Sequence, residues 1–431
     1  MNRSFSSTVQ QGGAGGSIRA WVPDLLLQLP EQARPRSSAE GLVAAELDWQ
    51  GGVLTTLRPL GADQPPPDGM VLPRLVEPHA HLDKAFSWSE HPNLSGTYDG
   101  AMAANLQEHQ TRTAELVHAR GERALRLACR HGLRAIRSHV DSLGPGAVCS
   151  WEALLDLRQH WRDRIDLQLV ALLPVEHWSS SDGQRLAAWI ASRGGLLGGV
   201  IPSPCPVRKM RAALRRLLEL AEQLGCGVDL HIDEADAYPA AGVGQLLRSM
   251  DGLSLSVPVT CSHASSLALL GAEPLRRLAD RIAEHQLQVV ALPLTNGWLL
   301  GRQGDRTPYC RPLAPIRQLQ RAGVGVAVGG DNIQDCWFPG GNLDPLALMA
   351  ASLFKAHLAP WERLGLEPFS SEAARLMGLI WDGVLRPGAP ADLMRLEASS
   401  WSEALSEPPR RRVLINGEWL DAFPGHAELQ H

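Results

Sequence analysis

Short apolar stretches alternate with longer amphipathic stretches along most of this chain. The amphipathic type is illustrated by residues 207–224, where Leu and Ala recur at helical spacing among Arg and Glu. The apolar stretches are too short for such helices and are typical of strands. Eight of them are predicted to be strands: 71–76, 133–139, 165–173, 196–201, 227–231, 257–262, 288–292 and 324–329.

The alternation predicts an α/β fold made of successive strand–helix units around a parallel sheet. Eight such units fit a (β/α)8 barrel of the TIM type, which we place at residues 68–384. In such barrels the catalytic residues lie at the C-terminal ends of the strands.

The two ends of the chain follow another pattern. Residues 18–67 and 385–431 contain short strand-like pieces and turns, such as Arg386-Pro387-Gly388. We expect them to form one small flanking β-domain built from both termini. Residues 1–17 are rich in Ser, Gln and Gly and lack an apolar core of signal-peptide length, so we expect a disordered tail.

Histidines and an aspartate stand at the ends of four predicted strands. His79 and His81 follow the first, and alternate residues of an extended segment share a face. A lone His-x-His pattern also occurs by chance in loops. Here, however, His231, His263 and Asp331 follow strands far downstream, so a metal site is favoured over structural histidines.

Composition narrows the class of protein. With 431 residues, 44% of them hydrophobic, the chain can bury a large core. A net charge of -5 without a basic cluster argues against nucleic acid as a partner, and no stretch approaches the roughly 20 apolar residues of a membrane span. The seven cysteines form no C-x-x-C pattern, so neither disulfides nor a thiolate zinc site is suggested. We expect a cytoplasmic protein.

Several short motifs, in this order and spacing, resemble the amidohydrolase superfamily and, within it, the metal-dependent cytosine deaminases of bacteria. The resemblance covers nearly the whole chain. It rests on VEPHAHLD (76–83), RSHVD (137–141), HIDE (231–234), SHAS (262–265), PLTN (293–296), GDN (330–332) and DCWFP (335–339).

Three histidines and one carboxylate suit a borderline divalent ion. His79, His81, His231 and Asp331 are the candidate ligands, and the ion is expected to be Zn(II) or Fe(II). The resemblance implies one ion per chain, because the lysine that bridges two metals in relatives is absent at residues 200–203. Such an ion lowers the pKa of water from about 15.7 toward about 7 and so provides hydroxide.

The resemblance also implies the roles of the residues that act with the metal. Glu234 is expected to shuttle protons to a ring nitrogen and to the leaving ammonia. His263 is expected to hydrogen-bond the attacking water and, with Asp331, to take its proton or stabilise charge. Trp337 is expected to form an apolar wall against a flat ring.

Four positions depart from the cytosine deaminase pattern and bear on the substrate. One is Gly330, which stands where the family has a histidine. Val175 stands where the family has a glutamine that pairs with the pyrimidine amide, and Asn332 replaces a second aspartate. Lys84 replaces a small polar residue and either binds an anionic or carbonyl group or caps a loop. The sequence therefore predicts cytosine to be a poor substrate, with Glu176 or Lys84 as alternative readers of the ring edge.

The predicted function is hydrolytic deamination of a small amino-substituted nitrogen heterocycle with release of ammonia. Two alternatives stay open: cleavage of a cyclic amide or of a substituted amine such as an N-alkyl triazine, and a non-catalytic barrel, which the intact ligands disfavour.

His139 is interpreted as a buried residue that satisfies a hydrogen bond rather than as a ligand. Asp83, Asp141 and Asp233 are second-layer supports or loop caps. A homo-oligomer is expected on general grounds.

Overall fold

A computed structural model of the chain describes residues 15–29 and 36–420, and these divide into two compact units. One unit contains residues up to Arg74 and from Gly383 onward, and the other is Leu75–Asp382. The expected tail lies outside the described residues up to residue 14, and Gly16 and Ser17 already belong to the first strand. The units are described separately below.

The first unit is built on a seven-stranded sheet with the order β15-β14-β13-β4-β1-β2-β3. Neighbouring strands are antiparallel except for the parallel pair β1 and β4. Strands from the N-terminal and C-terminal segments therefore share one sheet. Their bounds are β1 (Gly16–Pro23), β2 (Leu42–Gln50), β3 (Val53–Pro59), β4 (Met70–Pro73), β13 (Leu393–Leu396), β14 (Arg411–Ile415) and β15 (Glu418–Trp419), with helix α13 (Trp401–Ser406) between β13 and β14.

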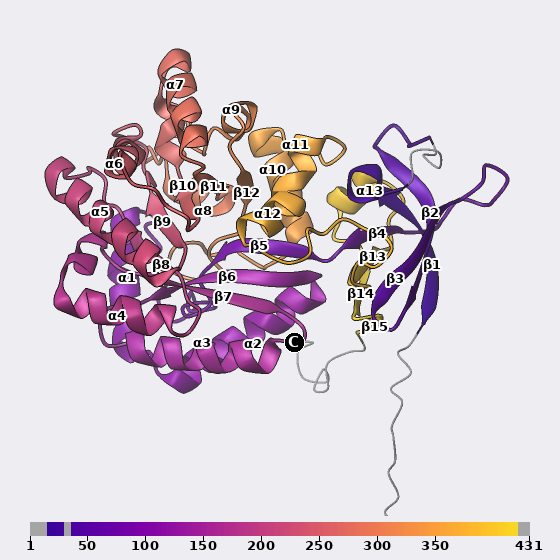
Figure 1. The fold of residues 1–431 in the computed structure, drawn as a ribbon, viewed down its shortest axis with the longest axis horizontal. Helices are drawn as coiled ribbons and strands as arrows, with labels where there is room; N and C mark the ends of the chain where they lie inside the picture. Colours follow the sequence, from indigo (N-terminus) through magenta and orange to yellow (C-terminus); the bar gives the residue numbers. More distant parts are fainter. Residues whose placement is uncertain (1–14, 30–35, 421–431) are drawn as a thin grey trace, which may run out of the picture. The chain divides into compact units, whose positions relative to one another are not determined.

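The second unit contains eight parallel strands in two hydrogen-bonded sets, β5-β6-β7 and β8-β9-β10-β11-β12 (Figure 1). Isolated parallel bridges join Val170 to Leu196 between β7 and β8, and Ala80 to Asp331 beside β5 and β12. The strands are β5 (Leu75–Ala80), β6 (Leu133–Asp141), β7 (Asp166–Leu172), β8 (Leu197–Val200), β9 (Val228–Ile232), β10 (Val259–His263), β11 (Gln288–Ala291) and β12 (Val326–Val328).

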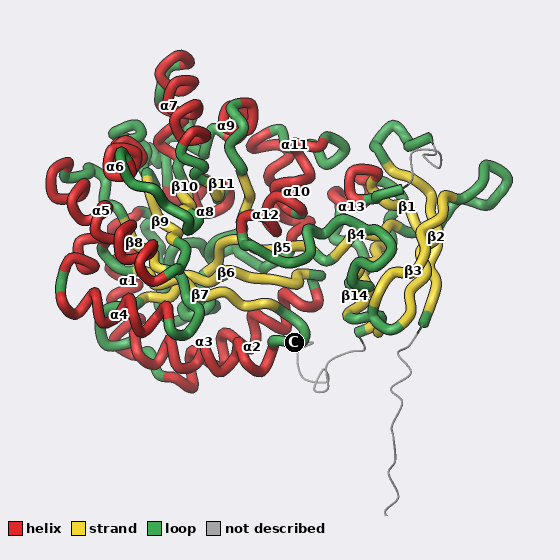
Figure 2. The backbone as a smooth tube through the Cα atoms, in the orientation of Figure 1, coloured by secondary structure: helices red, strands yellow, loops and turns green. Residues whose placement is uncertain are grey.

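Helices lie around these strands, as Figure 2 shows. Helix α5 shows why: its buried residues include Met210, Leu214, Leu217 and Leu218, which form one apolar stripe, and it ends at Gly225 in the left-handed conformation. The helices of this unit are α1 (Tyr98–Thr111), α2 (Ala114–Arg130), α3 (Ala147–Trp161), α4 (Ser181–Ala191), α5 (Val207–Leu224), α6 (Ala241–Met250), α7 (Ala272–Glu284), α8 (Pro293–Leu299), α9 (Ile316–Arg321), α10 (Pro345–Ala356), α11 (Arg363–Leu366) and α12 (Ser371–Leu376).

Among the described residues, no helix combines the length and the apolar character needed to cross a membrane.

Seven predicted strands coincide with β6 to β12, but the prediction of one strand at 71–76 is wrong. The chain changes sheets at Arg74, so that β4 and β5 belong to different units. Arg74 is 1% exposed, its amide donates to the Asp392 carbonyl, and its guanidinium contacts the Asp392 carboxylate at 3.4 Å. The next amide, of Leu75, instead donates to Gly132 at the start of β6. This buried ion pair ends the first strand.

The parallel strands are buried on both faces, which explains their almost continuous apolar sequences. Every residue of β9 is buried, and so is every residue of β10. Two polar side chains nevertheless lie on β9, Asp229 and His231, and His263 ends β10. Because burying polar groups costs free energy unless they gain partners, these residues mark the place where the site must lie.

Candidate metal centre and active site

Four predicted ligands meet where the parallel strands end. His79 belongs to β5, His81 follows it, His231 belongs to β9, and Asp331 follows β12. The Nε2 atom of His81 lies 3.3 Å from Nε2 of His231 and 3.3 Å from Oδ1 of Asp331. His79 Nε2 lies 3.6 Å from the same Asp331 oxygen. All four residues are buried, so the site brings together the set that the sequence predicted.

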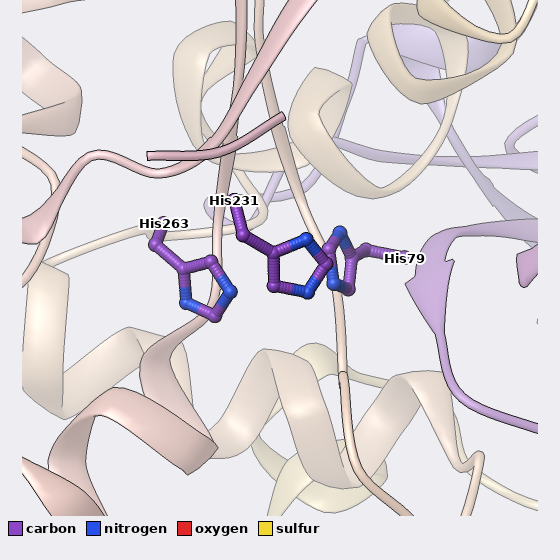
Figure 3. Close-up of side chains that lie close together, drawn as sticks. All are labelled: His79, His231 and His263. Carbon is purple, nitrogen blue, oxygen red and sulfur yellow. The ribbon is translucent and has the colours of Figure 1, made fainter. Parts of the chain in front are cut away.

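His263 extends this cluster. Figure 3 shows the ring of His231 between those of His79 and His263. The ring centroid of His231 lies 4.7 Å from the ring centroid of His79 and 4.8 Å from that of His263. These three histidines, like the trio of His79, His81 and Asp331, place ligand atoms within 4.8 Å of one another.

Several buried polar atoms of these residues have no hydrogen-bond partner among the described residues. They are Nε2 of His79, Nδ1 of His81, Nδ1 of His231, Nε2 of His263 and both carboxylate oxygens of Asp331. A buried polar atom without a partner costs about 1–3 kcal/mol. Nitrogen and carboxylate donors in this arrangement fit a divalent ion such as zinc.

The protonation states agree with metal binding. Burial, and then the neighbouring imidazoles, lower the pKa values of His79 and His231 well below the usual range of histidine. Burial also lowers the pKa of His263, to about 4, although Asp331 opposes this shift. Uncharged imidazoles are the form that binds a metal.

A second layer of hydrogen bonds orients His79. Ser262 donates to Asp229 at 2.7 Å, so its oxygen accepts from Nδ1 of His79 at 2.9 Å. The remaining ring nitrogen, Nε2, then carries the lone pair that faces the cluster. Arg137 donates to Asp229 at 2.9 Å. Sequence analysis missed Asp229, although its position two residues before His231 places it on the same inward face of β9.

His139 differs from its interpretation as a hydrogen-bonded core residue. It is fully buried and stacks on His79 with ring centroids 3.9 Å apart. Neither of its ring nitrogens has a hydrogen-bond partner in the described part of the chain, and the nearest Asp229 oxygen is 3.8 Å away. The expected hydrogen bond is therefore absent, because the Asp229 carboxylate is taken by Arg137 and Ser262.

Glu234 lies beside His263 and shares a neighbour with it. Glu234 Oε1 is 3.4 Å from Nδ1 of His263, and the Asn296 amide donates to that same nitrogen at 3.0 Å. Ser265 donates to the Asn296 oxygen at 3.2 Å, which fixes the orientation of the amide. His263 therefore carries its proton on Nε2, toward the cluster. Burial, followed by the charge of Asp331, raises the pKa of Glu234 well above its usual value, which favours the protonated acid.

Two residues of the cluster occupy strained backbone. The φ angles of His263 and Asp331 are 72° and 67°, in the left-handed region that non-glycine residues rarely adopt. Such conformations cost of order 1–3 kcal/mol each and are concentrated at functional sites.

A cavity of about 480 Å³ opens onto the cluster. Predicted site residues in its wall are His81, Lys84, His231, Glu234, His263, Asp331, Asn332 and Trp337, whereas His79 is fully buried behind it. Val175 is also fully buried and does not line the cavity. It begins a short 3-10 helix after Pro174, and the following residue, Glu176, reaches the cavity instead.

Asn332 is held by two polar neighbours. Thr295 donates to its oxygen at 3.1 Å, and its amide donates to Asp335 at 3.0 Å. The other Asp335 oxygen accepts from the backbone amide of Trp337 at 2.9 Å. Sequence analysis gave roles to Asn332 and Trp337 but quoted Asp335, which positions both, only as part of a motif.

Lys84, three residues after His81, belongs to a buried network of charges. Its ammonium group lies 2.9 Å from the Asp141 carboxylate. Arg112 donates to Asp83, Asp141 and Glu108, and its side chain is 0% exposed. Burial acts to lower the pKa of Lys84, but the charges of Asp141 and Asp83 outweigh it, and the pKa is raised. This lysine is therefore a cation in the cavity wall.

The fold and the site together define a metal-dependent hydrolase: parallel strands with helices around them, neutral imidazoles and a carboxylate at the strand ends, and a buried acid beside them. Residues 182–419 match the model of the Amidohydrolase family. The chain is 32% identical over 402 residues to the pterin deaminase of Rhizobium rhizogenes, covering 91% of each chain.

Two solved structures are also similar. The 5-methylcytosine deaminase from Klebsiella pneumoniae, liganded with 5-fluorocytosine, superposes with a TM-score of 0.79 at 26% identity and covers 94% of this chain and 97% of that one. The N-isopropylammelide isopropylaminohydrolase from Burkholderia multivorans has a TM-score of 0.71 at 26% identity. The match covers 89% of this chain and 96% of that one. The chain belongs to the amidohydrolase family and is a hydrolase of carbon–nitrogen bonds other than peptide bonds. The family is metal-dependent, and the described residues contain a His/Asp cluster that could hold a metal ion.

Proposed function

We propose that this enzyme hydrolytically deaminates a two-ring amino-oxo heterocycle of the pterin class. The observation that carries the proposal is the cluster of unpartnered imidazole nitrogens and Asp331 oxygens, with the protonated Glu234 beside it in one cavity. The similarity to a pterin deaminase over 91% of the chain supports the choice of ring.

The residues that hold the metal in this proposal are His79, His81, His231 and Asp331, with one ion per chain, Zn(II) or Fe(II). When bound, such an ion supplies the nucleophile by lowering the pKa of water from about 15.7 toward about 7. His263 is left out of the ligand set because Asn296 occupies its Nδ1, so its Nε2 carries a proton. No lysine stands at residues 200–203, which supports a single ion.

Three side chains of this protein move or hold protons during the reaction. Asp331 accepts a proton from the attacking water, and the Nε2 hydrogen of His263 stabilises the oxygen of that water. Glu234 gives its proton to the ring nitrogen beside the carbon that carries the amino group. It then takes the remaining hydroxyl proton that came from the water and passes it to the departing amine, and the proton held by Asp331 restores the acid form of Glu234. Water and the amino-heterocycle thus become the oxo-heterocycle and ammonia.

The cavity supports a ring larger than cytosine. Its volume of about 480 Å³ lies within the range of about 300–1,000 Å³ of small-molecule sites. Its wall combines polar groups, from the metal cluster and from the network of Lys84 and Asp141, with apolar side chains such as Leu173 and Met102. Tyr98 and Trp337, whose ring centroids are 5.0 Å apart, provide an aromatic surface for a flat ligand.

The function is tested by measuring product release from pterin, cytosine, 5-methylcytosine and N-isopropylammelide with metal-loaded enzyme. Pterin should give the highest kcat/KM, about 10⁴ M⁻¹s⁻¹ or above. The His79→Ala and His231→Ala double variant should release nothing above background. Cytosine as the best substrate would overturn the choice of ring, isopropylamine release would favour the substituted-amine alternative, and no release from any compound would overturn deamination.

We further propose that the eight parallel strands form a (β/α)8 barrel, near the expected bounds 68–384, with a small flanking β-domain near residues 18–67 and 385–431. Two seams between the sheets support closure. Amides donate across them from Ala171 to Leu196 and from Val200 to Leu173 at one seam, and from Asp331 to His79 at the other. A cytoplasmic location and a homo-oligomeric state remain part of the proposal and are tested by cell fractionation and light scattering.

A further inference from the structure

The cavity wall contains a histidine that the proposed chemistry does not use. His109, on helix α1, is 6% exposed and lines the cavity together with Lys84 and Asp141. Its Nε2 atom is buried and has no hydrogen-bond partner among the described residues. The nearest acidic oxygen, Oδ2 of Asp141, is 3.9 Å away, beyond hydrogen-bond distance.

The backbone fixes which nitrogen of His109 carries the proton. The amide of Gly146 donates to Nδ1 of His109 at 3.3 Å, so Nδ1 is the acceptor. In the neutral ring the proton is then on Nε2, which becomes a donor. Burial, and then the charge of Arg112, lower the pKa of His109, so the ring is neutral at physiological pH.

Lys84 places a second donor on the same wall. An ammonium group has three hydrogens, and Asp141, at 2.9 Å, is its hydrogen-bond partner. Two donors, one of them without any acceptor, therefore lie in this part of the wall.

The charges around these donors balance. Asp141 is bound to Lys84 and also to Arg112, at 3.2 Å. Three cationic side chains (Lys84, Arg112 and Arg120) are matched by three buried carboxylates (Asp83, Glu108 and Asp141). Arg120 also pairs with the exposed Glu90, so no positive charge is left over. A ligand carboxylate here would be repelled by the Asp141 carboxylate without a spare positive charge to offset it, whereas a neutral acceptor can take the free donor of His109 without adding a negative charge.

We propose that His109 Nε2 and Lys84 Nζ form a carbonyl-recognition subsite that binds the ring oxo group of the substrate. This inference rests on the proposed function and deepens it, because it adds a required feature to the substrate. The ring carries its amino group beside the metal cluster and an oxo oxygen beside His109. Rings without that oxygen leave the His109 donor unpaired, which is the basis of strong discrimination.

The test compares two product analogues, 2,4-dioxopteridine and 2-oxopteridine, which differ only in the second oxo group. Their dissociation constants are measured by titration calorimetry with the metal-loaded wild type, His109→Leu and His109→Gln. The wild type should bind the dioxo compound at least about 10-fold more tightly, and His109→Leu should remove that preference, a change of about 1.4 kcal/mol. His109→Gln should restore most of it, because its side-chain amide nitrogen replaces the Nε2 donor.

Two outcomes would overturn the subsite: an equal loss for both compounds in His109→Leu, which would indicate a structural role, or no preference in the wild type. The wild-type comparison remains decisive if His109→Leu does not fold. Binding is measured without turnover, so the wild type can prefer the dioxo compound even if it releases no ammonia from any substrate. That combination of results would refute only the proposed function. Equal rates of ammonia release from pterin and 2-aminopteridine would refute only the subsite.

Discussion

Two groups of polar residues differ in how well their polar atoms are satisfied: the metal cluster, called the metal end, and the charged network around Lys84 and Arg112, called the network end. At the metal end, four imidazoles and Asp331 have ligand atoms without hydrogen-bond partners among the described residues. At the network end, the Arg112 guanidinium lies within hydrogen-bond distance of four side chains, those of Glu108, Asp83, Asp141 and Ser150.

This difference separates a site that needs a ligand from a network that supports the fold. Unpartnered buried groups are rare in native proteins and call for an ion or a substrate. A satisfied ion network needs neither, and removing one member leaves an uncompensated buried charge. Among the described residues, Nε2 of His109 and Oδ1 of Asp83 are the unpartnered atoms of the network end. Of these two residues only His109 lines the cavity, which is why it is assigned to the substrate.

The largest expected effect is loss of the metal end. The double substitution His79→Ala and His231→Ala removes two of four ligands, so elemental analysis should give near-zero metal in place of about one ion per chain, with no ammonia release. His160→Ala, at a histidine whose side chain is 67% exposed, is the control. It should keep both the metal content and the ammonia release of the wild type. Undiminished metal in the double variant would refute the ligand assignment.

Glu234→Gln should separate catalysis from metal binding at the same end. The amide is nearly isosteric with the protonated acid but cannot shuttle a proton, so kcat should fall about 100-fold to 10,000-fold while metal content stays unchanged. Glu219→Gln, at an exposed glutamate on α5, is the matched control. If Glu234→Gln stays active, the proton role belongs elsewhere, most directly to His263.

At the network end, the main consequence of a substitution should be on stability. Arg112→Met leaves Asp83, Glu108 and Asp141 without a shared cation, and we expect the free energy of unfolding to drop by about 3–5 kcal/mol in urea denaturation. Arg185→Met is the control. It removes a guanidinium from a side chain that is 73% exposed, and it should change the free energy of unfolding by less than about 0.5 kcal/mol. Equal losses in the two variants would show that the buried network is not a stabilising feature.

The sequence predicted the metal end better than the network end for a physical reason. Parallel strands are buried on both faces, so a histidine at the end of an apolar stretch stands out, as His231 and His263 do. His109 gives no such signal, because it is one polar residue among many on helix α1. Only the tertiary structure brings it to the cavity and places Gly146 against its ring.

Two other features depend on contacts that spacing does not reveal. The change of sheet at Arg74 follows from an ion pair with Asp392, more than three hundred residues away along the chain. The turn after Pro174 places Val175 in the interior and Glu176 at the cavity. Comparison with a family glutamine identified the right turn but could not give the direction of each side chain.

Val175→Gln tests the cavity wall that contains residues of both ends. Since Val175 is fully buried and its neighbour, not it, lines the cavity, an amide there would have to be buried. We expect a loss of about 1–3 kcal/mol in stability and no gain in kcat/KM for cytosine. Glu176→Gln, at the position that reaches the cavity, is the companion variant. An improvement with cytosine in Val175→Gln alone would show that this side chain faces the substrate after all.

The smallest expected effect concerns Thr295, which joins the metal end to Trp337 through Asn332 and Asp335. Thr295→Val keeps the shape but removes the hydroxyl that donates to Asn332 at 3.1 Å, a loss of about 0.5–1.5 kcal/mol. The Asn332 amide still donates to Asp335, so the side chain keeps one anchor. KM should therefore rise severalfold while metal content and kcat change little, because Asp331 keeps its own position.

Thr111→Val, whose hydroxyl donates to the carbonyl of Glu108 outside this chain of contacts, is the control. A loss of metal in Thr295→Val would mean that the Asn332 contacts hold the ligand Asp331 itself, and that the two ends of the cavity are less independent than their hydrogen bonds indicate.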